Sequence, residues 1–223
     1  MTESTREAFI LDVLQWEPWL ERAPDTDLDP AHRERVESAI AGVPNSDYIA
    51  VLANDFEAWQ ARALVHRHVY TSEEPEPTAW RELGATTTSR INGCVFCASV
   101  HARNFANVSR KRDLAKAFLA EGLDASLPPT ERAIVDLAAK LTTDPESLAA
   151  PDLEPLRELG LDDLGILDIV NYAAFFANAN RLMLTLGEPV RKVSQSAPQS
   201  GQPPASQEAG ALVSRNERSR VHQ

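Results

Sequence analysis

The sequence predicts an all-α protein, and three observations support this fold class. Apolar residues recur at helical spacing along most of the 223 residues, which is typical of amphipathic helices. Proline and glycine fall between these stretches, where they begin or end helices. No stretch of useful length alternates apolar and polar residues as a half-buried strand does. The chain is therefore expected to be helical nearly throughout.

Four helices are expected in the first half of the chain. They cover residues 28–42, about 46–70, about 78–90 and about 94–108. Pro30 lies near the first turn of the first helix, where proline costs no intrahelical hydrogen bond. The proline-containing stretch 73–77 is expected to separate the second helix from the third. Asn92 and Gly93 separate the third from the fourth.

The second half is expected to hold three helices and one short segment. A short helix covers residues 109–122, two further helices cover residues 129–141 and 161–186, and the short segment follows Pro151. Pro128 and Pro129 open the middle helix, because proline fits the first turn. Gly122 and Gly187 end the other two, as glycine commonly does at helix C-termini.

An apolar arm precedes these helices. Residues 9–20 are rich in large apolar side chains, including Trp16 and Trp19, but Pro18 interrupts any helix there. Each large apolar side chain contributes about 1.5–3 kcal/mol when it is buried. We therefore expect an extended or broken arm that packs on the edge of its own subunit or on a neighbour in a homo-oligomer.

Residues 1–190 are expected to form one helical domain. From Ser194 to Ala209 the chain consists almost wholly of Ser, Gln, Pro, Ala and Gly. Such a composition does not bury enough apolar surface to offset the entropy of ordering. We predict that residues 191–223 form a disordered tail.

The charge and hydropathy of the chain exclude several classes of function. A formal net charge of -11 argues against a nucleic-acid partner and against docking on anionic lipid. No apolar run reaches the length of a membrane span, and the first residues lack the basic and apolar regions of a signal peptide. We expect a soluble cytoplasmic protein. In that reducing compartment a close cysteine pair suits redox cycling better than a structural disulfide.

Cys94 and Cys97 are the only cysteines, and they lie three residues apart at a predicted helix start. Unpaired N–H groups and the helix dipole favour a thiolate near Cys94. Cys97 is close enough in sequence to form a disulfide with it. His101 follows Cys97 by four residues, so it shares a helix face and can take or deliver a proton. We expect Cys97 to have the lower thiol pKa, because His101 can stabilise its thiolate.

Other interpretations of these residues stay open. Cysteine is often buried as a small apolar residue. Cys94, Cys97 and His101 are also zinc-ligand types, although a structural zinc site needs four ligands. We interpret His66 and His68 as structural or surface residues because they lie on different helix faces.

Glu82 precedes Cys94 by twelve residues and lies on the preceding predicted helix. Helices joined by so short a turn usually pack side by side, which would let Glu82 reach back to the dithiol and His101. Taken alone, Glu82 would be interpreted as a solvated surface carboxylate. Asn180 and Arg181 are interpreted as structural groups.

The spacing of four of these residues resembles the signature of the AhpD-like alkylhydroperoxidases, within the carboxymuconolactone decarboxylase superfamily. Eleven, two and three residues separate Glu82, Cys94, Cys97 and His101. The segments 130–142 and 178–187 resemble the later helices of the peroxidase-related branch of that superfamily. The resemblance covers most of residues 8–190.

The resemblance implies a bundle of antiparallel helices that assembles into trimers or hexamers. It also implies that Cys97 is the peroxidatic thiol, ionised through His101, and that Cys94 is the more exposed, resolving thiol. Glu82 would serve in a proton relay through water, so that it matters for catalysis and little for folding. Phe96 stands where the best-studied family member has a histidine, so that part of the relay is absent.

The leading hypothesis is a cysteine-based peroxidase that reduces hydrogen peroxide or organic hydroperoxides and needs no haem, flavin or metal. The Cys94/Cys97 dithiol passes through a sulfenic acid and a disulfide, and an external dithiol reductant, a protein or a lipoyl-type group, regenerates it. Three alternatives stay open. They are a thiol–disulfide oxidoreductase without significant peroxidase activity, a carboxymuconolactone decarboxylase-like enzyme, and a non-catalytic oligomeric binding protein whose dithiol is a sensor. The intact dithiol and His101 count against the decarboxylase.

Overall fold

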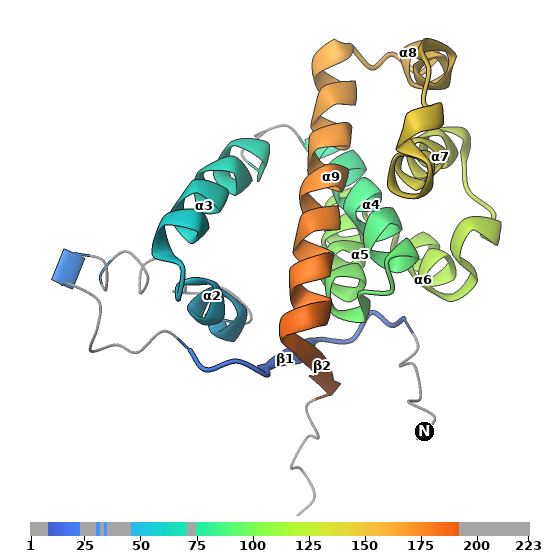
Figure 1. The fold of residues 1–223 in the computed structure, drawn as a ribbon. Helices are drawn as coiled ribbons and strands as arrows, with labels where there is room; N and C mark the ends of the chain where they lie inside the picture. The colour runs from blue at the N-terminus through green and yellow to red at the C-terminus, as the bar shows by residue number, and fades with distance from the viewer. Residues whose placement is uncertain (1–8, 23–29, 32–33, 35–45, 71–74, 192–223) are drawn as a thin grey trace, which may run out of the picture. The chain divides into compact units, whose positions relative to one another are not determined.

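The computed structural model describes residues 9–22, 30–31, 34, 46–70 and 75–191, and Figure 1 shows their arrangement. Most of the helix expected over residues 28–42, and all of the tail expected over residues 191–223 except residue 191, lie outside these described residues. The described chain is predominantly helical, so the all-α prediction is confirmed. None of its helices combines the length and the apolar character that a membrane span requires.

The described helices follow one another along the chain with short connections. They are α2 (Ser46–Leu52), α3 (Phe56–Tyr70), α4 (Pro75–Ile91), α5 (Val95–Ser109), α6 (Arg112–Glu121), α7 (Pro129–Thr143), α8 (Glu154–Glu158) and α9 (Asp163–Leu186). Short 3₁₀ turns lie beside α6, α7 and α8. A small sheet pairs β1 (Leu14–Pro18) with β2 (Gly187–Arg191).

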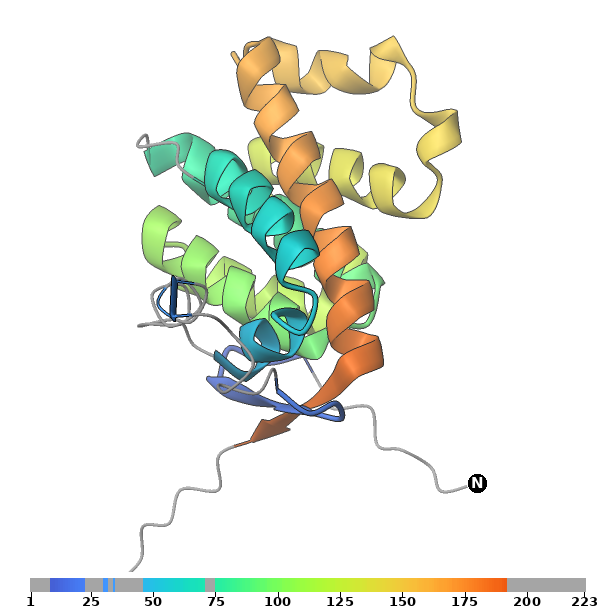
Figure 2. The ribbon, with the colours of Figure 1, turned by 60° about the vertical axis from the view of Figure 1, so that its left-hand side comes forward.

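Helix α4 is the centre of the core. It packs against α5, α7 and α9, and the long α9 runs alongside it in both views (Figures 1 and 2). Every residue from 81 to 89 is buried, although several are polar. Thr86 and Thr87 satisfy their hydroxyls by donating to the carbonyl oxygens of Glu82 and Leu83, which removes the cost of burying them. Helix α4 can therefore lie between its neighbours without an apolar sequence.

The sheet corrects the expectation that no strand forms. Trp16 is buried, pairs with Pro189 in the antiparallel register, and donates its indole N–H to the carbonyl oxygen of Met183 at 3.1 Å. A Cβ at Gly187 would lie 2.4 Å from the Trp16 ring, so only glycine permits this close approach. Each strand has a single neighbour, so both are edge strands, where proline is tolerated in a sheet.

The arm thus packs on its own subunit, one of the two positions expected for it. Trp19 is 59% exposed, so the two tryptophans of the arm have different surroundings. The expected homo-oligomer stays a prediction.

Three helix boundaries differ from the sequence-based expectation. The helix expected from Ser109 begins at Arg112, because α5 extends to Ser109. The helix expected over residues 46–70 is divided into α2 and α3, because Asp55 accepts a hydrogen bond from the N–H of Ala58 and starts a new helix there. Helix α4 begins at Pro75 rather than near residue 78. Both Pro75 and Pro77 fall in its first turn, where proline removes no intrahelical hydrogen bond.

Candidate active site

A tight turn between α4 and α5 places the two cysteines at the start of α5. Gly93 has φ of +79°, a left-handed conformation that favours glycine. The N–H of Cys94 donates to the carbonyl oxygen of Ser89 at 2.9 Å, and Cys94 is the residue that precedes the first turn of α5. The Asn-Gly break predicted from the sequence is therefore what directs α5 back along α4.

Both thiols are free and buried, with Cys94 2% and Cys97 3% exposed. They belong to an apolar cluster with Trp16, Tyr48 and Met183. The thiol of Cys97 donates a hydrogen bond to the thioether sulfur of Met183 at 3.3 Å. Both thiols are almost completely buried, and the expectation that Cys94 is the more exposed thiol stays a prediction.

The pKa values of the two thiols are shifted in opposite directions. A hydrogen bond from the Cys97 thiol lowers the pKa of Cys94, and backbone N–H groups of Cys97 and Phe96 and the Asn180 side chain act in the same direction, against burial. The pKa of Cys97 is raised because its proton is held by Cys94, because it is buried, and because a Cys94 thiolate repels a second charge. Cys94 is thus the more acidic thiol of the pair.

This order reverses the prediction that Cys97 has the lower thiol pKa. The prediction assumed that His101 stabilises a Cys97 thiolate. Instead, Asn180 and Arg62 are the groups that lower the pKa of Cys97, and their effect is smaller than that of Cys94. The backbone N–H groups at the helix start favour the first cysteine of the pair.

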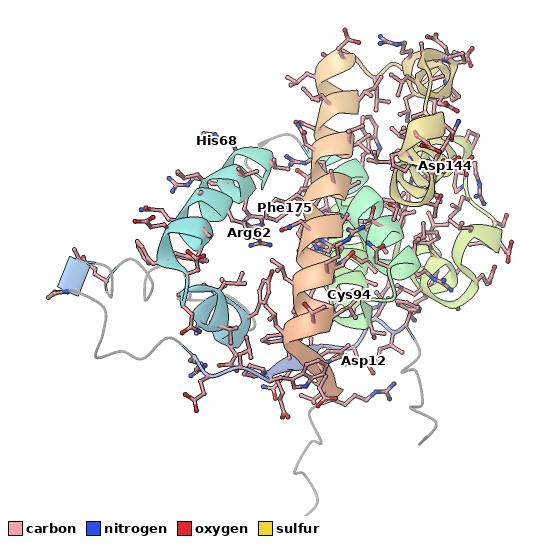
Figure 3. All side chains as sticks on the ribbon, in the orientation of Figure 1. Asp12, Arg62, His68, Cys94, Asp144 and Phe175 are labelled. Atoms are coloured by element: carbon pink, nitrogen blue, oxygen red, sulfur yellow. The ribbon has the colours of Figure 1, made fainter. Side chains whose placement is uncertain are left out.

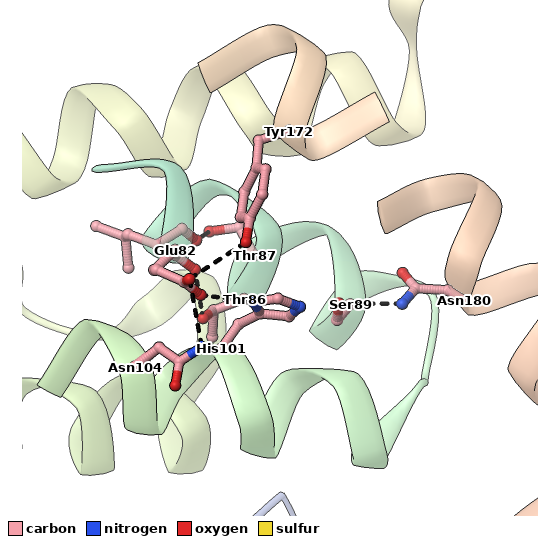
Figure 4. A network of polar contacts seen from close by, with 9 residues as sticks. Glu82, Thr86, Thr87, Ser89, His101, Asn104, Tyr172 and Asn180 are labelled. Carbon is pink, nitrogen blue, oxygen red and sulfur yellow. Dashed lines mark hydrogen bonds and ion pairs between the residues drawn. The ribbon is translucent and has the colours of Figure 1, made fainter. Parts of the chain in front are cut away.

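His101 is held by Glu82 in a buried polar network (Figure 4). The Nδ1 atom of His101 lies 2.6 Å from Oε2 of Glu82, and both side chains are almost completely buried. The other carboxylate oxygen accepts hydrogen bonds from the hydroxyl of Tyr172 at 3.2 Å and the amide of Asn104 at 3.3 Å. Glu82 is thus in direct contact with His101, which corrects the expected link through water.

Asn180 is a site residue that the sequence analysis missed. Its side chain is fully buried on α9, donates to the hydroxyl of Ser89 at 3.0 Å, and accepts from the amide of Asn92 at 3.1 Å. It also lowers the pKa of both cysteines. An asparagine within the apolar stretch of α9 was the available signal, but nothing local in the sequence connects it to the cysteines.

Arg62 on α3 supplies a positive charge near the dithiol. Its guanidinium lies 5.6 Å from the ring centroid of Tyr48 and 4.5 Å from that of Phe175, and Figure 3 shows it extending toward Phe175 on α9. His66, one turn along α3, stacks on Phe175 at 5.1 Å. Burial lowers the pKa of His66 to about 4, so it is neutral near pH 7, whereas His68 is exposed.

A zinc site is an alternative that the sequence analysis left open. In the part of the chain that the structure describes, no group of three or more His, Cys, Asp or Glu side chains is placed to hold a metal ion.

The chain is similar in fold to two solved structures. One, from Ralstonia eutropha JMP134, is described as an alkylhydroperoxidase AhpD core, an uncharacterized peroxidase-related protein, with 24% identity, a TM-score of 0.65, and coverage of 78% of this chain and 90% of that one. The other, an uncharacterized peroxidase-related protein from Silicibacter sp. TM1040, has 25% identity, a TM-score of 0.59, and coverage of 85% and 95%. No family model and no curated protein matches the chain. The resemblance to the AhpD-like, peroxidase-related branch is confirmed by these neighbours.

Proposed function

We propose that this chain, which has the AhpD-like fold of peroxidase-related proteins, is a cysteine-based peroxidase that reduces hydrogen peroxide or small organic hydroperoxides. The observation that carries the proposal is the free Cys94/Cys97 pair at the start of α5, in which hydrogen bonds lower the pKa of Cys94. A thiolate is the nucleophile that attacks peroxides, and a lowered pKa makes it available near neutral pH. The second thiol lies in the same buried cluster as the first, and a disulfide can form between the two.

The reduction of the peroxide balances with the two thiols alone, and an external dithiol is needed only to regenerate them. One thiolate attacks a peroxide oxygen, so that an S–O bond forms, the O–O bond breaks, and the leaving oxygen takes a proton to become water or an alcohol. The second thiol then attacks the sulfenic sulfur, which releases water and forms the Cys94–Cys97 disulfide. An external dithiol, a protein or a lipoyl-type group, returns two electrons and two protons.

The two cysteines differ in what the first step requires. The resemblance to the family assigns the attack to Cys97, and this stays a prediction. The pKa of Cys97 is raised and that of Cys94 is lowered. An attack by Cys97 therefore needs a base that takes its proton, whereas Cys94 ionises more readily.

His101 and Glu82 are proposed to handle the proton. A histidine whose Nδ1 is fixed by a carboxylate keeps one tautomer and one ring orientation. Its other nitrogen can then take a proton from a thiol and deliver it to the leaving oxygen. Tyr172 and Asn104 hold the carboxylate in place from its other oxygen.

Peroxide consumption with dithiothreitol as the reductant tests the proposal. The wild-type protein should consume peroxide catalytically, and the double variant Cys94→Ser/Cys97→Ser should not. A wild-type protein that consumes no peroxide but reduces small disulfides would overturn the proposal in favour of thiol–disulfide exchange. Phe96 supports that second candidate, because it stands where the best-studied relative has a further histidine.

A further inference from the structure

Tyr48 presents a buried hydroxyl without a hydrogen-bond partner. It lies in the first turn of α2, is nine-tenths buried, and makes an edge contact with Trp16 at a centroid distance of 5.5 Å. Among the described residues, the buried side-chain oxygens without a partner are the Tyr48 hydroxyl and Oε2 of Glu131. Such a group is costly to bury, so its position calls for a reason.

The side chain of Tyr48 packs in the same cluster as the two cysteines and Met183. Burial raises the pKa of Tyr48 above its ordinary value, and negative charge on either cysteine raises it further, against the charge of Arg62. The hydroxyl is therefore within electrostatic reach of both sulfurs, yet it makes a hydrogen bond to neither.

The other polar groups around the cysteines are already committed. The Asn180 amide donates to Ser89 and acts on the sulfurs, and the hydroxyl of Tyr172 donates to Glu82. Glu131 lies on α7, is paired with Lys111, and its carboxylate is an acceptor when ionised. Among the described residues near the dithiol, the buried Tyr48 hydroxyl is therefore the side-chain donor that remains available to bind a ligand.

We propose that the Tyr48 O–H binds the hydroperoxide by donating a hydrogen bond to one peroxide oxygen while the other oxygen contacts a sulfur of the dithiol. This inference rests on the peroxidase function proposed above and assigns it a substrate-binding residue. A hydroperoxide has two adjacent oxygens, one to receive the thiolate and one to leave. A bound substrate would thus bridge the hydroxyl and the sulfur and satisfy the hydroxyl.

The same contact favours the reaction. As the S–O bond forms and the O–O bond breaks, negative charge develops on the leaving oxygen, and a fixed donor stabilises that charge most in the transition state. Tyr48 keeps its own proton, because burial and the neighbouring sulfurs oppose the phenolate. The proton that neutralises the leaving oxygen is the one released when the attacking thiol ionised.

The variant Tyr48→Phe tests the proposal, since it keeps the ring and removes the hydroxyl. Two oxidants of the reduced protein are compared in rapid-mixing experiments: hydrogen peroxide, and a small aromatic disulfide that offers no peroxide oxygen to the hydroxyl. We expect the rate constant with peroxide to fall by about 10- to 100-fold, the lower part of the range known for single transition-state donors. The rate with the disulfide should stay within about twofold of wild type, and the melting temperature should not fall, because an unpaired buried hydroxyl is removed.

Tyr172→Phe is the matched control, because it removes a hydroxyl that has a partner. That variant should lower the melting temperature. An unchanged peroxide rate in Tyr48→Phe would overturn the inference and show that the hydroxyl binds only solvent. Equal slowing with both oxidants would also overturn it, because Tyr48 would then act on the thiolate. Failure of the wild-type protein to react with peroxide, with the disulfide reaction intact, would instead overturn the proposed function itself.

Discussion

Replacing Glu82 with Gln separates the charge of the buried carboxylate from its shape. The amide nitrogen can take the place of Oε2, and Nδ1 of His101 then becomes an acceptor in the other tautomer. The hydrogen bonds from Tyr172 and Asn104 to the remaining oxygen can persist. The loss is the charge-assisted bond to His101, which is 2.6 Å long.

The magnitude follows from the burial of that bond. A hydrogen bond to a charged group contributes about 1.5–3 kcal/mol, and each kcal/mol lowers the melting temperature of a domain of this size by about 2–4 °C. We therefore expect a loss of roughly 3–12 °C, which is more than the sequence analysis expected for Glu82. Peroxide turnover should fall by about 100-fold or more, as for other general acid–base groups.

The assay is peroxide consumption well below the melting temperature, with calorimetry on the same samples. Glu131→Gln is the matched control, because Glu131 is also a buried glutamate with a cationic partner, Lys111, but lies on α7. It should lose stability and keep its activity. If Glu82→Gln is as active as Glu131→Gln, Glu82 serves only to hold the fold and the relay hypothesis is wrong.

Three further predictions concern the dithiol and the assembly. Peroxide should convert the protein to an intramolecular Cys94–Cys97 disulfide, seen in mass spectrometry as the loss of two hydrogens; mainly intermolecular crosslinks would contradict this. The Cys97→Ser variant should alkylate faster near neutral pH than Cys94→Ser, because the backbone N–H groups of residues 96 and 97 still lower the pKa of Cys94, whereas burial still raises that of Cys97. The alkylation rate of Cys97→Ser should rise with pH through the Cys94 pKa and be lost below it. The reverse ranking of the two variants would restore the role of His101 at Cys97. Light scattering at micromolar concentration should show a homo-oligomer, and a monomer would refute that expectation.

The sequence predicted the helices well because helical periodicity and caps depend on neighbouring residues. It also placed the Cys94, Cys97 and His101 motif on one helix, since their spacing is local. It missed the β1–β2 pairing, because the arm and the end of α9 meet through residues such as Trp16 and Met183, which are 167 positions apart. Two short strands with prolines carry little pattern of their own.

The same limit explains the wrong order of the thiol pKa values. The i, i+4 relation between Cys97 and His101 is visible in the sequence, but it fixes only a shared helix face. The hydrogen-bond partner of His101 is Glu82 on α4, at 2.6 Å, and the spacing within α5 does not determine this contact. The donor that acts on both sulfurs is Asn180, from α9, and no local pattern connects it to the motif.

The dithiol and the Glu82–His101 pair share α5 but take their partners from different helices. Asn180, which acts on both sulfurs, belongs to α9, whereas Glu82 belongs to α4. Ser89 joins the two sides, because it lies on the same helix as Glu82 and its hydroxyl accepts from Asn180. Since α4 is buried along the whole stretch between these two residues, neither partner can move without disturbing the core. The chemistry of α5 is therefore set by the docking of α4 and α9, which is why a local motif identifies the nucleophiles but not the groups that activate them.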